Sequence, residues 1–216
     1  MDADADADAD GGAAMRVVHP IEALSYEILR SRVDTAHLPP LTRAVVERVI
    51  HSSADVGYLD DLVVSAEEHL RAAAAALRAG APVVTDAEMV AAGITSVTPI
   101  CRVRHVAPHA APHAAAHAAG HGGLTRSAAA IRLAYDEVGP GAVWAVGNAP
   151  TALEQLLRLD ARPALVVGLP VGFVGAVESK QALRESGLPA VSNVSEKGGS
   201  AVAAAAVNAL LYAEDS

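Results

Sequence analysis

The sequence predicts a single α/β domain with a mainly parallel β-sheet that is flanked by helices on both faces. Two observations predict this class. Short apolar segments rich in β-branched residues alternate with segments of helical periodicity from residue 82 onward. Several of the short segments end in glycine or a small polar residue directly before the next helical segment. Strands that alternate with helices in this way form parallel sheets, and the crossover helices bury both faces.

Helical segments begin the folded part of the chain and then separate its strands. Apolar residues recur at intervals of three and four, as in residues 45–50, which is the period of one helix face. Ser65 with Glu68, and Thr151 with Glu154, have the spacing of a capping box, in which two side chains satisfy free N–H groups at a helix start. We expect helices over residues 21–32, 41–52, 66–79, 86–92, 126–138, 151–159, 176–186 and 200–212.

The strands between these helices are expected to be short and buried. Their residues are β-branched or small, and turn residues lie at both ends of each segment. We expect strands over residues 82–85, 96–101, 142–146, 164–168 and 190–194. Because aromatic residues make up only 3% of the chain, the core must consist of Val, Leu, Ile and Ala packed between closely spaced elements.

Length, composition and charge exclude several classes of protein. At 216 residues the chain is long enough to bury one full core. The net charge is −9, and five of the negative charges are the alternating aspartates of residues 2–10. The chain has no basic cluster for nucleic acid and no window of about 18 consecutive apolar residues that would span a membrane. The single cysteine, Cys101, excludes an internal disulfide framework. We expect a cytoplasmic protein with no nucleic-acid or membrane partner.

Two low-complexity segments depart from this pattern. Residues 1–14 alternate Asp and Ala before two glycines, so we expect a disordered acidic tail ahead of a domain of residues 15–216. Residues 102–123 are rich in alanine and carry a histidine at every fourth position from 105 to 121. A continuous helix would align these histidines as a ladder able to bind Zn or Ni. Pro108 and Pro112 interrupt such a helix, so we expect a loop and no metal site, with a metal-handling protein as an alternative.

Polar residues and glycines gather where the predicted strands end, at residues 85–86, 147–148, 168 and 193. In open parallel sheets, ligands bind outside these ends. The junction from residue 168 to residue 180 contains three glycines, which expose N–H groups to an anion and let a flat ligand approach the main chain. It lacks the spacing of a dinucleotide-binding loop, and the chain has no phosphate-binding loop or nucleophile elbow. We therefore expect a small-molecule site at this edge of the sheet.

One histidine and one arginine are the first candidates for the chemistry of that site. His51 ends the apolar face of the second predicted helix. In that place a histidine either exchanges a proton near neutral pH or is a cation favoured by the helix dipole. Thr125 is placed to cap the next long helix. Arg126 in its first turn either favours a carboxylate or phosphate there or is simply solvated.

Seven collinear blocks between residues 19 and 211 resemble one known family. In order they are Pro20-Ile21-Glu22 with Ser25; Arg48-Val49-Ile50-His51; Gly80-Ala81-Pro82 with Asp86-Ala87-Glu88-Met89-Val90; Thr125-Arg126-Ser127-Ala128-Ala129; Gly147-Asn148-Ala149-Pro150-Thr151-Ala152-Leu153; Gly168-Leu169-Pro170-Val171-Gly172-Phe173-Val174-Gly175-Ala176 with Glu178-Ser179-Lys180; and Gly198-Gly199-Ser200. On these blocks the chain resembles the precorrin-8X methylmutase family, also called cobalt-precorrin-8 methylmutase.

The resemblance implies an isomerase of cobalamin biosynthesis that acts as a homodimer on a tetrapyrrole. The family moves a methyl group from ring carbon 11 to ring carbon 12, which converts precorrin-8X to hydrogenobyrinate or cobalt-precorrin-8 to cobyrinate, and it uses no cofactor. The resemblance implies that His51 donates or accepts a proton. The residues expected to contact the substrate are Ser25, Arg48, Thr85, Glu88, Arg126, Ser127, Asn148, Gly172 and Lys180. The alternative is a corrinoid-binding or carrier protein without catalysis.

Overall fold

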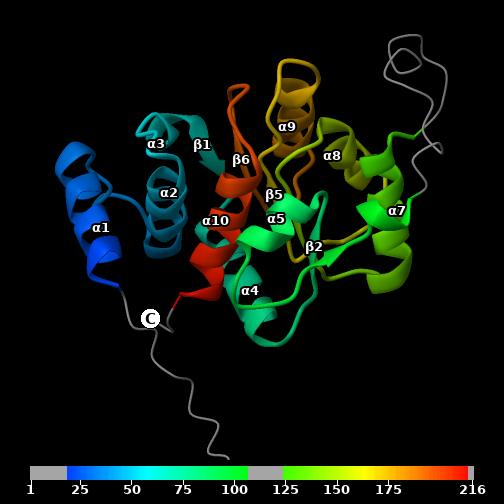
Figure 1. Ribbon diagram of the computed structural model, residues 1–216, viewed down its shortest axis with the longest axis horizontal. Coiled ribbons are helices and arrows are strands. Elements are labelled where there is room, and N and C mark those ends of the chain that lie inside the picture. The colour runs from blue at the N-terminus through cyan, green and yellow to red at the C-terminus, as the bar shows by residue number, and fades with distance from the viewer. Residues whose placement is uncertain (1–18, 107–123, 214–216) are drawn as a thin grey trace, which may run out of the picture.

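A six-stranded sheet forms the centre of the molecule (Figure 1). The computed structural model describes residues 19–106 and 124–213. The strands are β1 (Leu62–Val64), β2 (Val83–Thr85), β3 (Ile100–Cys101), β4 (Val143–Val146), β5 (Leu165–Gly168) and β6 (Ala190–Asn193). Their order is β1–β6–β5–β4–β2–β3, and every neighbouring pair is parallel except β1 with β6. The predicted α/β class with a mainly parallel sheet is confirmed.

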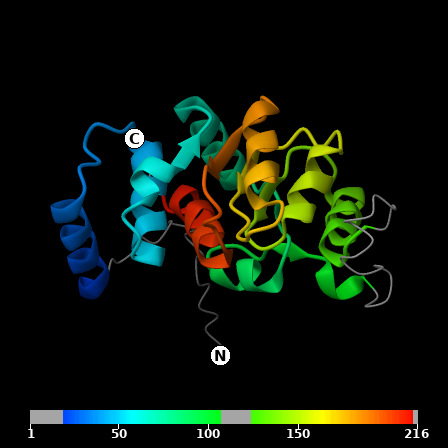
Figure 2. The same cartoon turned by 90° about the horizontal axis from the view of Figure 1, so that it is seen from above.

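Helices cover both faces of this sheet. They are α1 (Pro20–Arg32), α2 (Pro40–Ser53), α3 (Tyr58–Asp61), α4 (Glu67–Arg78), α5 (Glu88–Gly93), η1 (Val103–His105), α7 (Arg126–Val138), α8 (Pro150–Leu157), α9 (Ala176–Glu185) and α10 (Ser200–Leu211). On one face α4, α5 and α10 pack against the strands, with α2 against α10, and α7, α8 and α9 cover the other face (Figures 1 and 2). Helix α1 lies outermost and packs on α2.

The sequence pattern does not predict β1. This strand pairs antiparallel with β6, so that Leu62 lies opposite Asn193 and Val64 opposite Val191. It has three residues, all half-buried, and a segment this short shows no alternation of buried and exposed positions. Its antiparallel pairing means that the sheet is parallel only from β6 to β3.

Small residues let the last helix lie close to the sheet, as the composition predicts. Every residue of α10 from Val202 to Leu210 is buried. A Cβ atom on Gly147, at the end of β4, would lie 2.8 Å from the Cβ of Ala203. That distance is shorter than packed carbon atoms tolerate, so glycine and alanine together bring α10 to the end of this strand.

Both predicted capping boxes are wrong. Helix α4 starts without a side-chain cap, because the hydroxyl of Ser65 instead accepts the Ala190 N–H at 2.9 Å and so joins β6. Helix α8 starts one residue before Thr151, at Pro150, and the Thr151 hydroxyl lies 2.7 Å from that of Thr125. Thr125 does cap α7, as predicted, by accepting the N–H of residue 128 at 3.2 Å.

Several predictions fall wholly or partly outside the described residues. The acidic tail of residues 1–14 lies outside them, and so do residues 107–123 with the histidines at 109, 113, 117 and 121. His105 ends η1. Within the two described ranges, no three His, Cys, Asp or Glu side chains are grouped so as to hold a metal ion. No helix in those same ranges has both the length and the apolar character needed to cross a membrane.

Candidate active site

His51 lies in the last turn of α2 and faces α1. Its Nδ1 is 2.8 Å from the Oγ of Ser25, and its ring stacks on the ring of Tyr26, with centroids 4.9 Å apart and planes inclined by 11°. A hollow of 100 Å³ beside the imidazole is lined by Ser25, Arg32 and Val56 among others. The two helices thus bring together a histidine and a serine that are both expected in the site.

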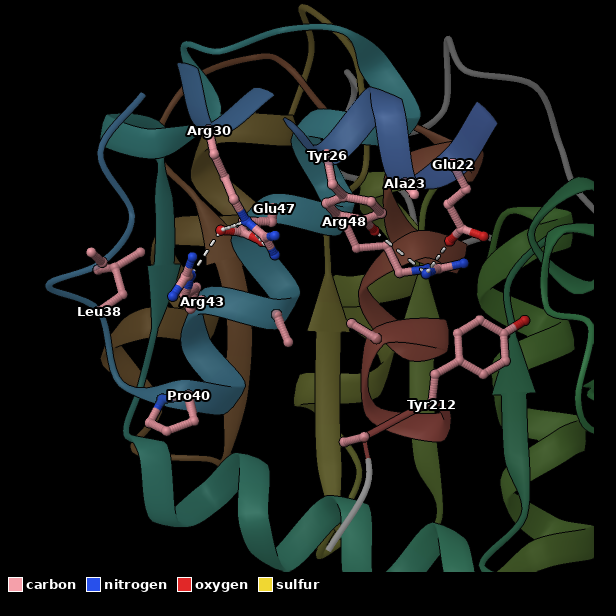
Figure 3. A pocket seen from close by; sticks show the side chains of 14 residues that line it. Glu22, Ala23, Tyr26, Arg30, Leu38, Pro40, Arg43, Glu47, Arg48 and Tyr212 are labelled. Atoms are coloured by element: carbon pink, nitrogen blue, oxygen red, sulfur yellow. Dashed lines mark hydrogen bonds and ion pairs between the residues drawn. The ribbon is translucent and has the colours of Figure 1, made fainter. Parts of the chain in front are cut away.

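Arg48 lies one turn before His51 on α2 and lines a larger cavity (Figure 3). Its Nη1 is 3.3 Å from Glu22 Oε1, and its guanidinium carbon lies 4.5 Å from the centroid of the Tyr212 ring. The cavity has a volume of 790 Å³ and is lined by residues of α1, of α2, of the segment that joins them and of the end of α10. Tyr26 lines this cavity as well, so one aromatic side chain contacts both the cavity and the imidazole.

A buried carboxylate joins α1 to α2 at the same cavity. Glu47 on α2 accepts hydrogen bonds from Arg30 at 3.1 and 2.7 Å, from Arg43 at 2.8 Å and from Thr35 at 2.5 Å. Burial opposes ionisation of this carboxyl, but the hydrogen bonds from Arg30, Thr35 and Arg43 outweigh it and lower its pKa to about 2. Glu47 is therefore ionised at neutral pH and holds Arg30 in place against α2.

Asp86 occupies the anion site formed by backbone N–H groups at the start of α8. Its carboxylate accepts the N–H groups of Gly147, Asn148 and Ala149 at 2.9, 2.9 and 2.7 Å. Burial raises the pKa of Asp86, and the three N–H donors act against that rise. These N–H groups are not open to a substrate carboxylate, which leaves the exposed side chain of Asn148 as the part of this turn that can meet a ligand. The preceding residue, Thr85, is only 2% exposed, so we do not retain it as a substrate contact.

The glycine run after β5 forms a loop that is bonded to the segment before α10. The N–H of Gly172 donates to the carbonyl of Glu196 at 3.2 Å. A Cβ atom on Gly198 would lie 2.7 Å from the carbonyl oxygen of Pro170, so only glycine permits this approach of the two loops. Phe173, at the tip of the first loop, is 97% exposed. Gly172 thus lies at an open surface, where the sequence predicts a ligand.

Lys180 is buried beneath these loops and does not face the site. Its ammonium donates to Asn193 Oδ1 at 2.9 Å, to the carbonyl of Lys197 at 2.7 Å and to the carbonyl of Ser195. The residue is 0% exposed, and burial lowers its pKa to about 8. Asp61 completes the cluster by accepting from Asn193 Nδ2 at 2.8 Å and from Ser195 Oγ at 2.7 Å. Because the ammonium is committed to the loop before α10, we do not retain Lys180 as the partner of a substrate carboxylate.

A hollow of 460 Å³ lies between this loop and the end of α2. It is lined by the two serines that follow His51, by Lys197 and by the first turn of α10. Lys197 is exposed, and its Nζ lies 2.7 Å from Asp55 Oδ2. Neither Lys197 nor Asp55 is predicted from the sequence to lie in the site. The one signal for Lys197 is its position directly before the block that begins at Gly198.

The family model for precorrin-8X methylmutase matches residues 20–213 of this chain. The chain belongs to the precorrin-8X methylmutase family. It is 42% identical to the cobalt-precorrin-8 methylmutase of Salmonella typhimurium over 202 residues, covering 89% of this chain and 93% of that protein. It is 44% identical to the precorrin-8X methylmutase of Pseudomonas aeruginosa over 192 residues, covering 86% of this chain and 91% of that protein. The crystal structure of precorrin-8X methylmutase from Thermus thermophilus has 35% sequence identity and a TM-score of 0.74, covering 88% of this chain and 93% of that one.

Precorrin-8X methylmutases are isomerases that move a methyl group within a tetrapyrrole of cobalamin biosynthesis. Membership of this family favours catalysis over the alternative of a corrinoid carrier. For a methylmutase, the contact between Ser25 and His51 places one imidazole ring beside an open hollow.

The remaining residues expected of a methylmutase site lie away from His51 within one chain. Arg126 and Ser127 begin α7, which is at the opposite end of the molecule from α1 and α2 (Figures 1 and 2). Glu88, the first residue of α5, pairs with Arg104, whose Nε lies 3.1 Å from Glu88 Oε1. A single chain therefore does not bring all the expected contacts to its own His51.

Proposed function

We propose that His51 protonates the bound macrocycle and so promotes migration of the methyl group from ring carbon 11 to ring carbon 12. The observation that carries the proposal is the 2.8 Å contact of His51 Nδ1 with Ser25 Oγ beside an open hollow. In the imidazolium form, Nδ1–H donates to the serine hydroxyl and Nε2 carries the second proton, which can be given to the substrate, leaving the neutral imidazole, and later recovered. One carbon–carbon bond breaks as another forms, no group leaves, and the mass stays unchanged.

We propose further that the substrate lies along the carboxyl edge of the sheet, next to His51. The glycine loop around Gly172 gives the flat ring a surface without side chains. The first turn of α10, whose cap residue Gly199 supplies no side chain, and the ammonium of Lys197 favour a carboxylate in the hollow between them. Ser25, Arg48 and Asn148 remain the other proposed contacts from this half of the site. We also propose a cytoplasmic location, which the buried free thiol of residue 101 suits.

A turnover experiment with two substrates tests the reaction. Purified protein is incubated separately with precorrin-8X and with cobalt-precorrin-8, and the visible spectrum and mass are followed. We expect at least one of them to give an isomer of unchanged mass with an altered spectrum, and the one that reacts defines the branch of the pathway. Unchanged spectra with both substrates would contradict the proposal, and tight pigment binding without conversion would support the carrier instead.

We propose that the enzyme is a homodimer in which α1 meets the second copy. Ile21, Leu24 and Ile28 are 72%, 54% and 43% exposed. Their spacing of three and four residues places them along one side of α1. Apolar surface of this kind, on the outermost helix of the fold, favours burial against a partner. We propose that the partner also supplies Arg126 and Ser127 to each active site, since α7 lies at the far end of the same chain from His51.

Mixing two inactive variants tests this arrangement. His51→Ala and Arg126→Ala are each expected to lose most activity as homodimers. After unfolding and refolding together, half of the dimers are expected to be mixed, and each mixed dimer has one intact site, so about a quarter of wild-type activity should return. The measurement is turnover before and after mixing, with sedimentation to confirm the dimer. A mixture no more active than its components would contradict a shared site.

A further inference from the structure

Tyr26 lies against the imidazole of His51 and has no role in the site described so far. The two rings are nearly parallel, inclined by 11°, with centroids 4.9 Å apart. Tyr26 and Ser25 are consecutive on α1, so their side chains leave the helix about 100° apart. The imidazole therefore meets α1 in two ways, at the Nδ1 atom through Ser25 and on the ring face through Tyr26.

Two arginines, each paired with a carboxylate, hold the Tyr26 ring on its other sides (Figure 3). The guanidinium carbon of Arg30 lies 5.6 Å from the centroid of the ring, and Nη1 of Arg48 lies 3.5 Å from the phenol oxygen. Arg30 is fixed by its bidentate pairing with Glu47, and Arg48 by its contact with Glu22. These contacts hold the ring between α1 and α2.

We propose that Tyr26 is a positioning residue for His51, fixing the plane of the imidazole so that Nδ1 stays on Ser25 and Nε2 faces the substrate. A hydrogen bond at Nδ1 alone leaves the imidazole free to turn about the line joining the two atoms. The stacked phenol removes that freedom, because a turn of the imidazole would break the parallel contact. The inference rests on the proposed role of His51 in proton transfer, where a small misplacement of the reacting atom costs rate rather than affinity.

Two substitutions of Tyr26 separate the effect of ring stacking from the effect of the hydroxyl group. Tyr26→Leu removes the planar ring and is expected to lower kcat by between about 10- and 100-fold with less than a threefold change in KM. Tyr26→Phe keeps the ring and loses the hydroxyl that contacts Arg48, so it is expected to keep at least about half of the wild-type kcat. Tyr135→Leu, which removes a half-buried tyrosine of α7 that bonds to the carbonyl of residue 160, is the matched control and should leave kcat unchanged.

A spectroscopic measurement reports on His51 without substrate. The imidazole signals of His51, identified by their loss in His51→Gln, are expected to shift in Tyr26→Leu, because the ring current of the phenol is gone, and to broaden, because the imidazole turns. They should stay near their wild-type positions in Tyr26→Phe. If the His51 signals shift in Tyr26→Leu but the wild-type protein turns over no substrate, the result supports the positioning role of Tyr26 and contradicts the proposed reaction.

Two results would overturn the inference. One is Tyr26→Leu with wild-type kcat and sharp His51 signals, and the other is an equal loss of kcat in the Leu and Phe variants. Thermal unfolding checks that each variant is folded at the assay temperature. Tyr26→Met, which keeps the bulk without a planar ring, carries the same expectations where the Leu variant is not folded.

Discussion

Replacement of His51 by alanine is expected to lower the kcat of methyl migration by about 10²–10⁴-fold while substrate still binds. This is the contribution of one well-placed acid–base group. The loss should fall on kcat because the imidazole is half-buried beside the hollow and its proposed part is to move a proton rather than to hold a carboxylate. Pigment binding by the variant, followed by absorbance, separates lost chemistry from lost affinity.

A second histidine of the same chain provides a matched control. His69 on α4 also places its Nδ1 2.8 Å from a serine hydroxyl, that of Ser65, but this contact is exposed and belongs to another part of the fold. His69→Ala is expected to keep wild-type turnover. Ser25→Ala is expected to lose less activity than His51→Ala, because the imidazole remains and only its orientation at Nδ1 is released. Full activity in His51→Ala would remove this residue from the mechanism.

The sequence is sufficient to predict strands that have a clear local pattern of apolar residues and turn residues. Strand β4 was expected over residues 142–146 and is found at Val143–Val146, and β5 was expected over 164–168 and is found at Leu165–Gly168. Both are apolar segments followed by glycine or a polar residue and then a helix, and that pattern depends only on neighbouring residues. Strand β1 forms by pairing along the edge of β6 that β5 leaves open, a condition that nothing within residues 62–64 reveals.

The direction of side chains at the sheet edge could not be predicted in the same way. Asp86 and Lys180 both lie at predicted strand–helix junctions, and from sequence each could face a ligand or the interior. The outcome depends on residues far along the chain. Asp86 meets the N–H groups of residues 147–149, and Lys180 meets oxygen atoms of residues 193–197. The contact of Tyr26 cannot be predicted from the sequence for the same reason, since its partner His51 comes from another helix.

Replacement of the buried Lys180 by methionine is expected to lower the free energy of unfolding by about 2–4 kcal/mol at neutral pH. The methionine side chain has similar length, but it removes the ammonium donor from Asn193 Oδ1 and from the carbonyls of Ser195 and Lys197. The two carbonyls then keep the weaker, neutral donor Asn193 Nδ2. These carbonyls belong to the loop that carries Lys197 into the proposed substrate hollow. We therefore expect KM to rise more than kcat falls, which turnover measured over a range of substrate concentrations will show.

A lysine at the surface of the same loop is the control for that loss of stability. Lys197 pairs with Asp55 in an exposed ion pair, and Lys197→Met should cost less than about 1 kcal/mol, as exposed pairs do. Urea unfolding of both variants compares the two costs. Equal costs would mean that the ammonium of Lys180 is no more important to the fold than a surface charge.

The pH dependence of the Lys180→Met effect follows from the pKa of the lysine. Burial lowers this pKa from 10.5 to about 8, so between pH 8 and 10.5 the unfolded chain binds a proton that the folded chain has released. The folded state therefore gains stability as the pH rises through this window, by up to about 3 kcal/mol. Methionine does not titrate, so the difference in unfolding free energy between wild type and variant should widen from pH 8 to pH 10.5. Other titrating groups contribute equally to both proteins and cancel in this difference. A constant difference across that window would mean that the ammonium keeps an ordinary pKa, and that its three oxygen partners fully offset the cost of burying it.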